Sequence, residues 1–185
     1  MTGIPRRALL TGGAAALVLG ACNNGIGGSG AARLDARVAA TQAYLAANYP
    51  GTNDLAAKSV GQLVMPLVTE AGLGFGGSYG RGALIVNGVT VDYYSAAQAT
   101  FGIQIGAQQY AHVLYFMTPE ALQEFRTSAG WAAGADVEYA VNDRGANISA
   151  DTTTVLAPVI AVVFGQAGLL AGATVEGTKY SRIIP

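Results

Sequence analysis

Residues 72–94 read GLGFGGSYGRGALIVNGVTVDYY, and they set the expected architecture of the chain. The first half of this stretch alternates glycine with larger residues. The second half is an apolar run that enters Asn87-Gly88 and continues as Val89–Tyr94. An Asn-Gly pair between two strand-forming runs predicts a tight β-hairpin, because both turn residues need a positive φ. Glycine weakens a strand unless the backbone bends sharply or packs closely. The stretch therefore predicts a strongly coiled, glycine-rich antiparallel sheet or a partly closed β-barrel.

Helices are predicted on the N-terminal side of this hairpin. Apolar residues recur at helical spacing from Leu34 to Leu45 and predict an amphipathic helix that ends before Pro50. Asp54 is expected to cap a second short helix that ends near Lys58. The two helices would form an N-terminal segment that packs on the sheet.

A third helix is predicted in the middle of the chain. Thr118-Pro119-Glu120 combines an N-cap threonine, a proline at the first helical position and an acidic residue near the positive helix end. Ala121, Leu122 and Phe125 would form its inner face. Other strands are expected in six segments: 101–108, 111–117, 130–141, 155–164, 168–176 and 179–184. The predicted class is α+β, dominated by an antiparallel sheet.

Composition restricts the function before any motif is considered. The chain has 185 residues, of which 51% are apolar and 11% charged, and one domain is the natural expectation at this length. Ten Lys and Arg against eleven Asp and Glu, without a basic stripe, argue against a nucleic-acid partner. One Cys and one His cannot build a disulfide framework or a zinc site with several such ligands. We expect no metal and no cofactor.

Residues 1–21 are predicted to be an export signal. Arg6-Arg7 precedes the uncharged run Ala8–Gly20, which is too short to cross a hydrocarbon core that needs about 20 helical residues. Leu19-Gly20-Ala21-Cys22 resembles a bacterial lipoprotein box, in which the cysteine is acylated and becomes the mature N-terminus. An ordinary signal peptide with an incidental Cys22 is the alternative. The arginine pair also resembles a twin-arginine signal, so the export route stays open.

The expected mature protein is a tethered domain in the bacterial cell envelope. Residues 22–32 would be the lipidated cysteine and a flexible Gly- and Ser-rich tether, and residues 33–185 the domain. Removal of the signal leaves eight Lys and Arg against eleven Asp and Glu, a net charge of −3. The domain would face the periplasm, and Asn23 after the cysteine weakly favours the outer membrane.

Two glycine motifs suggest enzymes, and both lack their structural context. Gly72–Gly77 matches a dinucleotide-binding pattern, but a hairpin follows it instead of the helix that must hold the pyrophosphate. Gly76–Gly80 matches a nucleophile elbow around Ser78, and Asp92 and His112 follow in α/β-hydrolase order. That elbow needs a strand-to-helix turn, and strands are predicted on both sides of it. A serine esterase is kept as a remote alternative, and the expectation is a protein that is not an enzyme.

Several segments together resemble the SYLF family of lipid-binding domains. They are Ala57-Lys58-Ser59-Val60, Pro66, the run 71–82, the glycine-glutamine segment 101–108, Gly168-Leu169-Leu170-Ala171-Gly172 and Glu176-Gly177. The resemblance extends from about Leu34 to Ile184. It implies a compact β-rich domain without catalytic activity. Eukaryotic members are associated with phosphoinositide membranes and some with actin, and bacterial members are often secreted or lipoprotein forms. Actin is not an expected partner of an exported bacterial protein.

The resemblance also implies where lipid would be recognised. The family links lipid binding to its N-terminal portion, and the cations that match there are Arg33, Arg37 and Lys58. A net charge of −3 argues against strong attraction to anionic bilayers, so an apolar ligand site or a weak contact assisted by the Cys22 anchor fits better. The prediction is a non-catalytic lipoprotein that binds lipid or the membrane surface. The alternative is an assembly lipoprotein that binds another envelope protein through a strand edge or a tyrosine patch.

Overall fold

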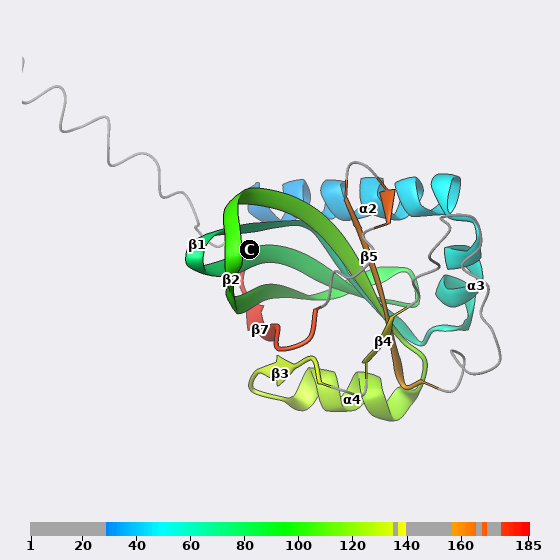
Figure 1. Cartoon of the computed structure of the whole chain (residues 1–185). Coiled ribbons are helices and arrows are strands. Elements are labelled where there is room, and N and C mark those ends of the chain that lie inside the picture. Colours follow the sequence, from blue (N-terminus) through cyan, green and yellow to red (C-terminus); the bar gives the residue numbers. More distant parts are fainter. Residues whose placement is uncertain (1–28, 135–136, 140–156, 166–167, 170–174) are drawn as a thin grey trace, which may run out of the picture.

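The computed structural model of the chain describes residues 29–134, 137–139, 157–165, 168–169 and 175–185 (Figure 1). Within them lie three helices and a seven-stranded sheet. The elements are α2 (Gly30–Asn48), α3 (Gly51–Lys58), β1 (Gly61–Val86), β2 (Val89–Phe116), α4 (Pro119–Thr127), β3 (Trp131–Ala132), β4 (Val137–Tyr139), β5 (Val159–Gly165), β6 (Gly168–Leu169) and β7 (Lys179–Ile183). The predicted α+β class, with N-terminal helices and one mid-chain helix, is confirmed.

The predicted hairpin is the centre of the fold. Asn87 has φ 51° and Gly88 has φ 76°, as the turn requires. From this turn β1 and β2 pair antiparallel along almost their entire length, out to Gly61 opposite Phe116. Strands of 26 and 28 residues are far longer than the roughly 5–6 residues of an ordinary strand. Strands this long must curl, and Figure 1 shows that both strands are strongly bent along their length.

Glycines permit this curl by allowing close backbone contact. A Cβ on Gly72 would lie 2.5 Å from the Cα of Gly76, and one on Gly80 would lie 2.7 Å from the carbonyl oxygen of Leu67. A Cβ on Gly82 would overlap the carbonyl of Val64. The second half of β1 therefore lies directly against its first half. The prediction of a strongly coiled, glycine-rich sheet is confirmed.

The remaining strands extend the sheet from β2. The order is β3-β7-β2-β5-β4, with β1 also paired to β2 and β6 to β5. All pairs are antiparallel except β4 with β5, where Val137 lies opposite Val159 in a parallel register. The predicted antiparallel sheet is confirmed, and β4 with β5 is its one parallel pair among the described residues. The strand expected over residues 130–141 is interrupted, since Ala133 and Gly134 belong to neither β3 nor β4, and residues 135–136 and 140–141 lie outside the described residues.

The helices agree with the sequence with one correction. Leu34, Val38 and Leu45 form the buried side of α2, as predicted. The second helix begins at Gly51, so Asp54 lies in its first turn and is not its cap. The reason is that Pro50 already has the helical φ of −53°, which starts the new helix as soon as the previous one ends.

The third helix begins as predicted. The Thr118 side chain caps α4 by accepting a hydrogen bond of 3.2 Å from the backbone N–H of Ala121. Phe125 is buried, while Ala121 and Leu122 pack against the core from partly buried positions. The predicted inner face of α4 is therefore confirmed.

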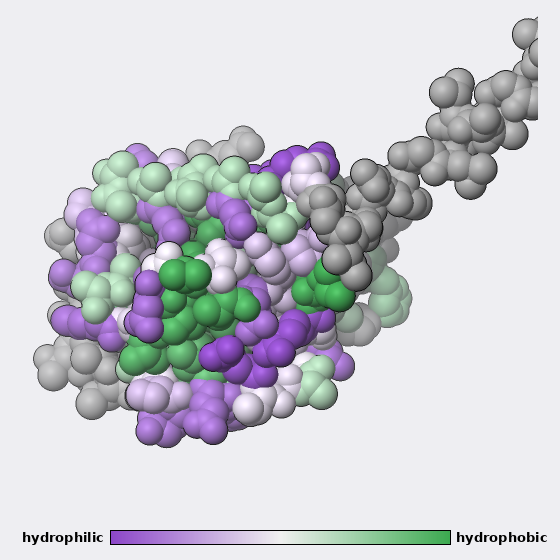
Figure 2. All heavy atoms as spheres, turned by 180° about the vertical axis from the view of Figure 1, so that it is seen from behind, coloured by the Kyte–Doolittle hydropathy of each residue, from purple (hydrophilic) through white to green (hydrophobic). Residues whose placement is uncertain are grey.

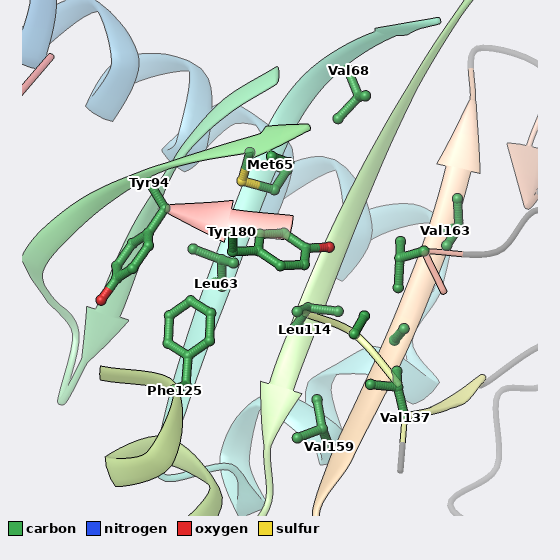
Figure 3. Close-up of a cluster of buried hydrophobic side chains, with 14 of the residues drawn as sticks. Leu63, Met65, Val68, Tyr94, Leu114, Phe125, Val137, Val159, Val163 and Tyr180 are labelled. Atoms are coloured by element: carbon green, nitrogen blue, oxygen red, sulfur yellow. The ribbon is translucent and has the colours of Figure 1, made fainter. Parts of the chain in front are cut away.

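Two hydrophobic clusters occupy opposite faces of the sheet. Residues of β1, β2, β5 and β7 pack with Phe125 of α4 in the first cluster (Figure 3). Residues of α2 and α3, including Leu45 and Leu55, cover the other face of β1, β2 and β5. Both clusters are built from residues 38–180. A chain that begins at residue 23 therefore contains every side chain that forms them.

Candidate functional site

A hollow of about 430 Å³ lies between α2 and the sheet, which we call the α2 groove. This volume falls within the range of roughly 300–1,000 Å³ that is typical of small-molecule sites. Its walls come from α2, β1, β2 and β5. The lining residues are Ala40, Thr41, Tyr44, Pro66, Leu67, Gln109, Tyr110, Ala111, Phe164 and Gly165. Most of these side chains are apolar.

A β-bulge at Pro66 shapes one wall of the α2 groove. Met65 pairs with His112 and Val68 pairs with Tyr110, so two residues of β1 lie opposite the single residue Ala111. Proline has no N–H to donate to a sheet and is found at such bulges. The bulge leaves the Leu67 side chain 39% exposed. The bulge at Pro66 thus exposes the apolar side chain of Leu67 at the groove.

Aromatic rings form the opposite wall. Tyr44 of α2 stacks on Phe164 of β5, with ring centroids 5.8 Å apart and an angle of 17° between the planes. The Tyr44 side chain is still 38% exposed, while Phe164 is buried. A tyrosine in this position presents an apolar ring and a polar hydroxyl, the combination that suits the boundary between lipid and water.

Tyr110 of β2 also lines the groove, and its side chain packs in the first cluster on the other face of the sheet. Burial raises the pKa of its phenol, the nearby Glu70 carboxylate raises it further, and a side-chain hydrogen bond with Ser78 opposes them. The hydroxyl therefore stays protonated at neutral pH and can only exchange hydrogen bonds. The arrangement suits binding of an apolar or amphipathic molecule.

The predicted cations do not line the α2 groove. Arg33 and Arg37 lie one turn apart on the exposed side of α2, and Lys58 is the exposed last residue of α3. Arg33 donates from Nε to the Ser29 carbonyl oxygen at 3.2 Å. The rest of the exposed side of α2 is largely alanine, visible as the pale green row in Figure 2. Cys22 lies outside the described residues.

The structure does not assemble the serine triad of the esterase alternative. Ser78 is buried in the middle of β1, not on a strand-to-helix turn. Asp92 forms ion pairs with Arg126 and Arg182 at 3.5 and 3.3 Å. His112 is buried, and its Nε2 lies 2.8 Å from the Tyr180 hydroxyl. Within the described residues its Nδ1 has no hydrogen-bond partner. His112 is thus a core residue.

Burial of His112 makes folding sensitive to pH. Desolvation lowers the pKa of this imidazole to about 3. The unfolded chain takes up a proton at this histidine near pH 6.5, and the folded chain does not. The contribution of neutral His112 to the free energy of unfolding is therefore fully present above pH 6.5 and is lost progressively as the pH falls towards 3. We expect this histidine to reduce the free energy of unfolding by about 2 kcal/mol between pH 7.5 and pH 5.

Urea denaturation of the wild type and of His112→Gln at both pH values checks this expectation. Glutamine is polar but does not titrate, so the variant should lack this part of the pH dependence. The same pH dependence in both proteins would show that other groups cause it.

Sequence reasoning did not identify the residues of the α2 groove. The available signal was Pro66 inside a run of strand-forming residues, which indicates a bulge and an exposed neighbour. Pairing of Tyr44 with Phe164 had no sequence signal, since 120 positions separate them. Among the described helices, none is both long and apolar enough to cross a membrane. In the same part of the chain, no three His, Cys, Asp or Glu side chains gather as a metal site.

Comparison with known proteins agrees with the resemblance found in the sequence. No curated protein matches the chain. The family model described as "Ysc84: Las17-binding protein actin regulator" matches residues 97–182. This segment begins in β2, ends in β7 and includes Tyr110 and Phe164 of the α2 groove. Residues 97–182 therefore match the SYLF family that the sequence resembles.

Proposed function

We propose that the protein is an envelope lipoprotein whose SYLF domain binds membrane lipid without catalysing a reaction. Residues 1–21 would be the export signal, residues 22–32 the acylated Cys22 and its tether, and residues 33–185 the domain. The protein would face the periplasm, with the outer membrane favoured by Asn23. The observation that supports lipid binding is the α2 groove, an open apolar hollow on a domain of a family associated with lipids.

The physical argument rests on apolar surface that is open to a ligand. Leu67 and Tyr44 keep more than a third of their side-chain surface in water beside the groove. Burying apolar surface contributes about 25 cal/mol for each Å² removed from water. Acyl chains on Cys22 would hold the domain at the bilayer and raise its local concentration there, so a weak contact suffices. Arg33, Arg37 and Lys58 are proposed to add weaker, salt-sensitive contacts from the exposed helix surfaces.

Liposome flotation of residues 23–185 tests the proposal without the anchor. Vesicles of phosphatidylcholine alone and with phosphatidylglycerol are compared at low and physiological salt. Flotation in the absence of the acyl group would show that the domain itself recognises lipid, and its salt dependence would separate charge from apolar insertion. Absence of flotation on every vesicle would contradict lipid binding by the domain.

Leu67→Ser should weaken flotation on neutral vesicles. Removing about half the burial free energy of a leucine, on the order of 1 kcal/mol, lowers partitioning about fivefold. Val89→Ser is the matched control, because Val89 is also an exposed apolar strand residue and does not line the α2 groove. Equal losses in the two variants would mean that general surface hydrophobicity, and not this groove, carries the binding.

An assembly lipoprotein is the second proposal, supported by a different surface. Phe75 is 78% exposed and Tyr79 is more than half exposed on the same side of β1. Exposed aromatic side chains are common at protein interfaces. Cross-linking in cells that captures one stoichiometric envelope protein, lost in a Phe75→Ser and Tyr79→Ser variant, would favour this function over lipid binding.

A further inference from the structure

Two arginines share one carboxylate on the surface formed by α4, β2 and β7. Arg126 Nη2 lies 3.5 Å and Arg182 Nη2 lies 3.3 Å from Oδ2 of Asp92. A single carboxylate cannot neutralise two guanidinium groups, so the cluster keeps one unit of positive charge. This local charge contrasts with the net charge of −1 of the whole chain.

Both guanidinium groups have donors to spare. Arg182 Nη2 also donates to the Arg126 carbonyl oxygen at 3.2 Å and lies 3.5 Å from the Tyr94 hydroxyl. An arginine carries five N–H donors, and within the described residues only Nη2 of each of these two arginines has a protein partner. The side chains are 43% and 53% exposed. Their unused nitrogens can therefore receive an anion.

A hollow of about 520 Å³ lies beside the two arginines. Val60, Pro119 and Leu122 supply an apolar side, and Gln123, Thr127 and the two arginines supply a polar side. Arginine binds phosphate through parallel N–H donors more effectively than lysine. A phosphate next to the arginines and hydrocarbon next to Leu122 would together match both sides. That combination is the chemistry of a phospholipid.

The position of this hollow suits a lipid in the bilayer that anchors the protein. A Cβ on Gly30 would lie 3.0 Å from the carbonyl carbon of Pro185, so the start of α2 and the C-terminus are adjacent (Figure 1). Arg182 is three residues from that end, and Cys22 is eight residues before Gly30. At about 3.6 Å per residue, the chain keeps Arg182 within roughly 40 Å of the acylated residue.

We propose that Arg126 and Arg182 bind the phosphate group of an anionic phospholipid, whose glycerol and first acyl carbons lie against Val60, Pro119 and Leu122. The site is separate from the α2 groove and shares none of its lining residues. The lipid as the source of the phosphate rests on the function proposed above. Asp92 acts as an internal competitor that holds the two guanidinium groups together before the phosphate arrives.

The test is flotation of residues 23–185 on vesicles with and without phosphatidylglycerol, using charge-changing variants. Each basic residue near an anionic membrane contributes about fivefold to partitioning, so Arg126→Gln with Arg182→Gln should reduce binding to anionic vesicles by about tenfold or more. Binding to neutral vesicles should not change. Arg81→Gln with Lys179→Gln is the matched control, since it removes the same charge from exposed residues outside this hollow.

Asp92→Asn gives a prediction in the opposite direction. It keeps the shape of the side chain and removes the competing charge, so binding to anionic vesicles should rise by about threefold or more. A variant that merely folded poorly would lose binding and could not gain it. Circular dichroism and the thermal unfolding midpoint of each variant confirm that the domain is intact.

The outcomes separate this site from the proposed function. If the double arginine variant binds anionic vesicles as the wild type does, the site is overturned, and flotation on neutral vesicles still supports lipid binding. If the wild type floats with no vesicle, the thermal unfolding midpoint is measured with and without inorganic phosphate. A phosphate-dependent rise in the unfolding midpoint that needs both arginines would assign the site to free phosphate, and its absence would overturn the site.

Discussion

Replacing Gly82 with alanine adds one methyl group and is expected to lower the free energy of unfolding by at least about 3 kcal/mol. The added Cβ would overlap the carbonyl oxygen of Val64 and the sulfur of Met65. The backbone obstacle cannot rotate away as a side chain can. The two halves of β1 would have to move apart, and the close packing of Gly82 against Val64 and Met65 would be lost. The urea midpoint of unfolding measures the loss.

Gly134→Ala is the control for Gly82→Ala. Among the described residues, no heavy atom lies within 4 Å of a Cβ placed on Gly134, and its φ is not positive. Alanine at such a position is neutral or stabilises by up to about 1 kcal/mol, because it restricts the unfolded chain. Similar losses at both glycines would mean that flexibility, not close backbone packing, explains the glycines of this sheet.

Phe125→Ala is expected to destabilise the domain by about 3–5 kcal/mol. The Phe125 side chain is 1% exposed. Its ring centroid lies 4.6 Å from that of Tyr94 and 4.9 Å from that of Phe116, and edge contacts join it to Trp131 and Tyr180. Figure 3 shows it reaching from α4 into the cluster formed by the sheet. Removal would leave a cavity and release the helix from the core.

Chemical denaturation monitored by Trp131 fluorescence checks this prediction, because Trp131 contacts the Phe125 ring directly. Phe75→Ala is the matched control. The Phe75 side chain is 78% exposed, so its loss should change the free energy of unfolding by less than about 0.5 kcal/mol. A small effect at Phe125 would indicate that α4 contributes little to the stability of the sheet.

Elements with local signals could be predicted from the sequence. Asn87-Gly88 predicted the hairpin because its backbone requirement is met by those two residues alone. Thr118 predicted the start of α4 for a similar reason, since a cap needs only the next few N–H groups. The boundary at α3 was wrong because Pro50 can end one helix or begin the next, and only its neighbours decide which.

The candidate sites depended on residues that are distant in the sequence. The α2 groove joins Tyr44 of α2 to Phe164 of β5, and no local pattern relates the two. Arg126 of α4 and Arg182 of β7 meet only because the fold brings both side chains to Asp92 of β2. The predicted cations Arg33, Arg37 and Lys58 lie on the helices and line neither hollow. Recognition of the family depended on ordered motifs and did not require these contacts.

Local chemistry in the sequence was sufficient for the class, the curl of the sheet, the hairpin and the helices apart from the start of α3, because turns, caps and glycines act over a few residues. Tertiary structure alone decided the parallel pairing of β4 with β5, the burial of His112 against Tyr180, and both hollows. These features arise where strands far apart in the chain are brought side by side. They are stabilised by packing and charge interactions between residues that are distant in the sequence, and no local sequence pattern indicates those contacts.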